Sequence, residues 1–64
     1  MKEISRTDTC VAFEGNGRFA NMVVDNSFRQ YFKVIVKGED EKVKILATRC
    51  TYDKAYRIIK DFLK

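Results

Sequence analysis

The period of the hydrophobic pattern changes near Thr51, and this change constrains the fold more than any other feature of the sequence. Before it, apolar and polar residues alternate, most regularly in YFKVIVK (31–37), as in a strand with one buried face. After it, apolar residues recur at three- and four-residue spacing in YDKAYRIIKDFL (52–63), as in an amphipathic helix. Because both segments have one apolar face to bury, we expect a sheet covered by a C-terminal helix.

Turn-forming residues divide the alternating part into four strands. GNG at 15–17, DNS at 25–27 and GEDE at 38–41 mark the turns, because these residue types accept tight-turn backbone conformations. The predicted strands cover about residues 9–14, 18–25, 28–37 and 42–50, and the helix about 52–63, with Thr51 as its N-cap. The predicted fold class is α+β: a four-stranded antiparallel β-meander packed on one C-terminal α-helix (ββββα), in a single small domain of residues 1–64.

Counting residues back from the turns gives a strand register and hence two faces. A four-residue GEDE loop pairs Lys37 with Lys42, and a GNG loop places Phe13 opposite Phe19. Asn21 then falls among the helix-facing residues, a conflict that a one-residue change at the middle turn would remove. The rest of the predicted helix-facing layer is Val11, Phe13, Phe19, Val23, Phe32, Val34, Val36, Val43 and Ile45.

The opposite face of this predicted sheet is basic, and three interpretations of it are open. It is an ordinary solvated face, a nucleic-acid surface on which the basic side chains contact phosphates and Tyr31 stacks on a base, or a protein interface. The nucleic-acid interpretation uses Arg18, Arg29, Tyr31, Lys33, Lys37, Lys42 and Lys44. The protein interpretation uses Met22, Tyr31, Ile35 and Leu46 as anchors.

Of the binding functions, the sequence favours nucleic acid. Thirteen Lys and Arg against nine Asp and Glu give a net charge of +4, which favours an anionic partner. A single strand suits a sheet better than a duplex does, because an open sheet offers splayed bases a broad platform. The alternative is a small accessory or inhibitory protein of the phage type that binds a protein partner, or forms a homodimer, through the same face.

The composition argues against catalysis, a metal site and membrane contact. The chain has no histidine to act as a general base or to complete a zinc site. Cys10 and Cys50 are too few for a disulfide framework, and on the first and last predicted strands they would lie out of bonding reach. No segment approaches the roughly 18 apolar residues of a membrane span. We therefore expect a cytoplasmic protein without enzymatic activity or cofactor.

The order of four strands and a terminal helix resembles two known kinds of module. One is the single-stranded-DNA-binding domain of the transcriptional coactivator family, over about residues 28–63, and the other is the small sheet-plus-helix module at the start of some phage integrases. The resemblance concerns the order of elements and implies no site residue.

Overall fold

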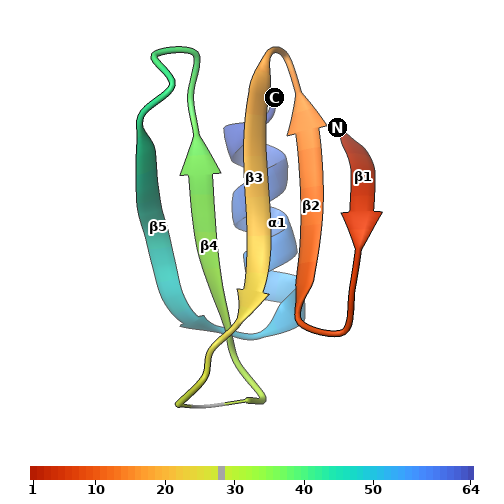
Figure 1. The fold of residues 1–64 in the computed structure, drawn as a ribbon, viewed down its shortest axis with the longest axis vertical. Helices are drawn as coiled ribbons and strands as arrows, with labels where there is room; N and C mark the ends of the chain where they lie inside the picture. Colours follow the sequence, from red (N-terminus) through yellow and green to blue (C-terminus); the bar gives the residue numbers. More distant parts are fainter. Residues whose placement is uncertain (28) are drawn as a thin grey trace.

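The computed structural model describes residues 1–27 and 29–64, which form five strands and one helix (Figure 1). The strands are β1 (Lys2–Arg6), β2 (Cys10–Gly15), β3 (Arg18–Val24), β4 (Phe32–Lys37) and β5 (Val43–Cys50), and the helix is α1 (Tyr52–Phe62). Every neighbouring pair is antiparallel, and the order in the sheet, β1-β2-β3-β4-β5, repeats the order in the chain. In Figure 1, α1 lies behind the sheet and covers one of its faces. The predicted α+β arrangement of an antiparallel sheet with a C-terminal helix is confirmed.

β1 is a strand that the sequence pattern did not predict. It pairs with β2 from Lys2 opposite Glu14 to Arg6 opposite Val11, with an irregularity between Glu3 and Ser5. All five of its residues are exposed, so it has no buried face and shows no hydrophobic alternation. The predicted four-stranded meander is therefore one strand short within the described residues.

The turn between β2 and β3 sets the register of β3. Asn16 (φ 53°) and Gly17 (φ 77°) both have positive φ, and Gly15 pairs with Arg18, so the turn has two residues where three were expected. This moves β3 by one residue relative to the prediction. As a result Ala20 and Met22 face α1, and Phe19, Asn21 and Val23 face away from it. The conflict over Asn21 is resolved at this turn and not at the middle one.

The next connection is longer than expected. β4 begins at Phe32, which pairs with Val24, so the predicted strand 28–37 starts four residues too early; its first residue, Phe28, lies outside the described residues. Asp25 begins the connection and is buried. Its Oδ1 accepts a hydrogen bond of 2.9 Å from the Ser27 N–H, and its own N–H donates to the Tyr31 carbonyl at 3.0 Å.

The connection between β4 and β5 is also longer, by one residue. Lys37 pairs with Val43, and Glu41 has a positive φ of 61°. The predicted Lys37–Lys42 pair is therefore wrong, as are the pairs counted inward from it. Val43 shares a face with Lys37 and Ile45 with Ile35, so these two residues lie on the side away from α1.

The core lies between α1 and the inner side of the sheet. Met22 and Ile59 have no exposed surface, and Phe13 contacts Tyr56 of the helix edge-on, with ring centroids 5.8 Å apart. Four residues predicted for this layer, Phe19, Val23, Val43 and Ile45, face the other way. The buried apolar residues are Val11, Phe13, Ala20, Met22, Val34, Val36, Cys50, Ala55, Ile59 and Leu63.

Both ends of α1 are fixed by side chains. The Thr51 hydroxyl accepts a hydrogen bond from the Lys54 N–H at 3.3 Å, which confirms the predicted N-cap. At the other end, Arg18 Nη1 donates to the Phe62 carbonyl at 2.7 Å and Asn16 Nδ2 donates to the Leu63 carbonyl at 3.0 Å. The β2–β3 hairpin thus satisfies carbonyls that a helix leaves unpaired at its end. No helix in the described ranges has the length and apolar character that crossing a membrane requires.

Candidate binding surface

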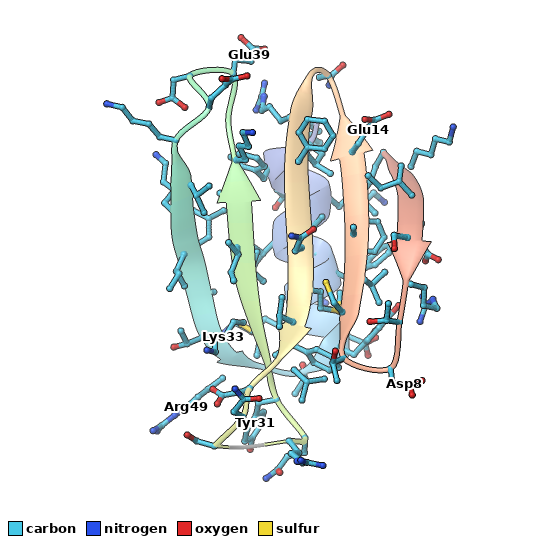
Figure 2. All side chains as sticks on the ribbon, viewed as in Figure 1. Asp8, Glu14, Tyr31, Lys33, Glu39 and Arg49 are labelled. Carbon is cyan, nitrogen blue, oxygen red and sulfur yellow. The ribbon has the colours of Figure 1, made fainter. Side chains whose placement is uncertain are left out.

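The surface of the sheet turned away from α1 is named the outer face. Residues paired across antiparallel strands share a face, so the register defines its members on β2 to β5. Figure 2 looks onto this face, with Glu14 toward one end and Lys33 toward the other. Its residues are Cys10, Ala12, Glu14, Phe19, Asn21, Val23, Lys33, Ile35, Lys37, Val43 and Ile45.

Apolar side chains run across the outer face from β3 to β5. In one row the register aligns Phe19 with Lys37 and Lys37 with Val43; in the next it aligns Ile35 with Ile45. Phe19 is 42% exposed, Val43 67% and Ile45 60%, although aliphatic and aromatic residues usually bury most of their surface. We call Phe19, Ile35, Val43 and Ile45 the apolar strip. Exposed apolar side chains gathered on one face, here with Lys37 between Phe19 and Val43 and Asn21 beside Ile35, are typical of interaction sites.

Two lysines on β4 accompany the apolar strip, Lys33 beside it and Lys37 between Phe19 and Val43. Lys33 and Lys37 lie two residues either side of Ile35 on β4, so all three side chains project from the same face. The ion pair found among the described residues joins Glu3 and Arg6 of β1, so neither lysine is neutralised by a salt bridge within that part of the chain. The outer face therefore combines exposed apolar side chains with two positive charges, one beside the apolar strip at Lys33 and one within it at Lys37.

The seven residues predicted to bind nucleic acid do not share one face. Lys33 and Lys37 are on the outer face, whereas Lys44 pairs with the buried Val36 and lies on the helix side. Arg18 is on the helix side as well, because the shorter β2–β3 turn reverses the direction of its side chain. The other three lie in connections: Arg29 and Tyr31 between β3 and β4, and Lys42 between β4 and β5.

The four predicted protein anchors are also divided. Met22 is fully buried against α1, so its assignment to an exposed interface is wrong, for the same reason of register. Ile35 is on the outer face, and Leu46, which is 43% exposed, follows Ile45 at an irregularity in the pairing with β4. Tyr31 is half-buried in the connection before β4.

Basic residues gather at the end of the sheet where β3 and β4 are connected. Lys33 of β4 lies opposite the part of β5 that contains Arg49, and Figure 2 shows Tyr31, Lys33 and Arg49 at this end. A hollow of about 320 Å³ is found here. It is lined by Asp8, Thr9, Val24, Asn26 and Arg29. Arg49, which has a positive φ of 53°, was not among the predicted site residues.

Sequence reasoning placed three residues of the apolar strip, Phe19, Val43 and Ile45, in the core. A signal for Phe19 exists: Asn-Gly favours a two-residue turn with positive φ at both positions, and that turn alone gives the observed register of β3. The five-residue connection before β5 has no comparable signal, because Glu41 is not a residue type expected at positive φ. The exposure of Val43 and Ile45 could not be read from the pattern.

A separate polar contact links β1 to the start of α1. Arg6 Nη2 donates to Glu3 Oε1 at 2.9 Å and to the Tyr52 hydroxyl at 3.2 Å. The hydrogen bond from Arg6 holds the pKa of Glu3 below its ordinary value, and the same contact raises the pKa of Arg6. Glu3 pairs with Phe13, so these groups are on the helix side and outside the outer face.

The described side chains of the outer face are suited to non-covalent contacts, and few of them are groups that react or bind metals. Cys10 is half-buried on the outer face and Cys50 is buried on the inner side, and neither is disulfide-bonded in the described structure. Within residues 1–27 and 29–64, no three His, Cys, Asp or Glu side chains lie close enough together to hold a metal ion. Comparisons with protein-family models, with characterised proteins and with solved structures found no match, so the geometry of the outer face is the basis for a functional assignment.

Proposed function

We propose that the chain is a non-catalytic binding module that docks a partner protein through the outer face. The observation that supports this is the exposure of the apolar strip on a regular sheet surface. Burial of apolar surface contributes about 25 cal/mol per Å², so a partner that covers the apolar strip would stabilise the complex. Protein interfaces combine apolar and polar side chains, and here Lys33 and Lys37 add positive charge beside and within the apolar strip.

The size and charge of the outer face limit the kinds of partner protein that can bind to it. The molecule extends 30 × 19 Å across the view of Figure 1, somewhat less than the roughly 600–1,000 Å² that each protein contributes to a standard interface, so a partner would have to use nearly the whole outer face. The charges of Lys33 and Lys37 favour a partner whose apolar surface also carries carboxylates. A second copy of the chain is less suited, because each copy carries a net charge of +4.

Site-specific photo-crosslinking in the producing cells tests this proposal. A benzoylphenylalanine at Phe19 on the outer face is compared with one at Tyr56 on α1, because the two positions are similarly exposed, at 42% and 39%. We expect a discrete protein adduct from position 19 and none of the same mass from position 56. Adding Ile35→Glu, a charge within the apolar strip, should abolish the adduct while circular dichroism shows an unchanged fold.

The result that would overturn the proposal is equal labelling from both positions, or an adduct from position 19 that survives Ile35→Glu. A single adduct with twice the mass of the chain would identify a homodimer, which analytical ultracentrifugation would show independently. That outcome would replace the partner protein by a second copy on the same face.

A second candidate function is binding of single-stranded nucleic acid at the basic end of the sheet. The observation that favours it is the placement of Tyr31, Lys33 and Arg49 at one end of the sheet, where phosphates and a stacked base could be contacted together. Fluorescence anisotropy of a labelled oligonucleotide across a salt series tests it. The slope of log affinity against log salt should fall by about one unit in Lys33→Glu. Lys44→Glu, on the other side of the sheet, should change it less, and equal responses would speak against this surface.

A further inference from the structure

The described residues form a sheet with two edges, β1 and β5, which differ in how well they are protected against pairing with a strand of another chain. β1 carries Lys2, Glu3 and Arg6 in five residues, and its pairing is interrupted between Glu3 and Ser5. Charges and irregular pairing are the usual means by which an edge strand avoids adding to another chain. The β1 edge is therefore guarded.

The β5 edge is open over its first residues. Val43, Lys44 and Ile45 pair regularly with β4, and the irregularities of this strand come after them. Its residues from Val43 to Leu46 are all exposed, and it contains neither glycine nor proline. Apart from strand pairing, no backbone hydrogen bond of the described chain involves this segment, and in Figure 1 nothing lies beyond β5 on its free side. Its outward N–H and C=O groups are available to a further strand.

The side chains of this segment specify what could pair with it. Val43 and Ile45 project from the outer face, whereas Lys44 projects from the helix side and has no salt bridge within the described residues. A strand laid beside β5 would place one side chain near each of these, on the same face. The complementary pattern is apolar, acidic, apolar. A second copy of β5, paired antiparallel so that Val43 faces Ile45, would set Lys44 opposite Lys44, which is unfavourable.

We propose that the β5 edge accepts an extended acidic segment of the partner protein as an additional strand of the sheet. The inference rests on the proposed function, since it specifies one part of the partner that docks on the outer face. The added strand would extend the apolar strip beyond Ile45 with its own apolar residues, and its carboxylate would pair with Lys44 on the helix side.

A designed peptide tests this edge directly. The probe is acetyl-Thr-Val-Glu-Val-Glu-Val-Thr-amide, titrated into the whole chain and followed by two-dimensional amide NMR spectra. We expect the shifts to concentrate on Val43 to Leu46 and their β4 neighbours, with β1 unaffected. The same peptide with lysine in place of glutamate should bind to the chain at least fivefold more weakly. The acidic peptide should likewise bind at least fivefold more weakly to the Lys44→Glu variant, because in both cases an attractive cross-strand pair becomes repulsive.

A backbone-blocked peptide separates strand addition from side-chain contact. N-methylation of alternate residues keeps every side chain but removes the donors of one edge, so it should abolish binding to β5. Unchanged binding of the methylated peptide, shifts centred on β1, or no binding of the acidic peptide would each overturn the inference. If the acidic peptide fails while the Phe19 crosslink still forms, the edge proposal falls and the docking function stands; if both fail, both are rejected.

Discussion

At the scale of single residues, Gly15 shows how closely the first hairpin approaches the end of the helix. A Cβ added there would lie 3.0 Å from the Leu63 carbonyl oxygen and 3.1 Å from Leu63 Cβ. We expect Gly15→Ala to lower the free energy of unfolding by about 1–3 kcal/mol, because backbone atoms must move to accept the methyl group. Urea unfolding monitored by circular dichroism measures the loss.

Gly17 provides the matched control for this prediction. Its φ is 77° and nothing lies within 4 Å of an added Cβ, so Gly17→Ala should cost about 1 kcal/mol through backbone strain alone. Amide spectra should show a shifted Leu63 in the Gly15 variant and an unshifted one in the Gly17 variant. A Leu63 signal that moves in neither protein would contradict the close packing of the hairpin on the helix end.

The contact between Glu3 and Arg6 makes a second prediction at this scale. The Glu3 carboxyl should titrate below its ordinary value of 4.5 in carbon-detected NMR, and Arg6→Gln should return it toward that value. Because the folded-state pKa is lowered, the pair stabilises the fold above the unfolded-state value, and the effect is lost as pH falls through the folded-state value. Both groups are exposed, so the effect on stability should be small. An unchanged midpoint in Arg6→Gln would rule out the contact.

At the scale of elements, the contribution of the N-cap to the stability of α1 can be tested by comparing the same substitution, Thr to Ala, at the cap and at another position. Thr51→Ala removes the hydroxyl that accepts the Lys54 N–H and should cost about 1 kcal/mol, which lowers Tm by roughly 4–8 °C in a domain of this size. Thr48→Ala deletes the same atoms from an exposed position on β5 and should cost less. Thermal unfolding of both variants makes the comparison; equal shifts would mean that the cap does not hold the helix.

The elements also show how far sequence reasoning reaches. The helix and three of the strands, β2 to β4, follow from periods of 3.6 and 2, since each has an apolar face that is buried, whereas β5, which is mostly exposed, was located by the turn residues before it. β1 gave no such signal because all its residues are exposed. It was harder to predict which side chains face the helix, because one residue more or less in a turn exchanges the two faces of the following strand. For this reason Met22 was expected outside and Phe19 inside, although Ile35, Lys33 and Lys37 were placed correctly on the outer face.

At the scale of the whole molecule, the assignment of inside and outside can be tested by two truncations. Met22→Ala empties space in the core and should cost about 2–5 kcal/mol, comparable to the whole stability expected for 64 residues. Leu46→Ala removes a side chain that is 43% exposed and should cost far less. Chemical unfolding measures the free energy of unfolding of both variants. Similar losses in the two would contradict the burial of Met22 and place it at the surface.

The spatial order of the strands, which repeats their order in the chain, has a consequence for assembly. Each new strand is laid against the one just completed, so the growing sheet offers a template at every stage and no segment needs to be threaded between others. The contacts between residues far apart in the chain are made by the helix, for example where Leu63 and Phe62 accept hydrogen bonds from Asn16 and Arg18 of the hairpin. During synthesis the inner surface of the sheet would therefore stay exposed to water until α1 has left the ribosome.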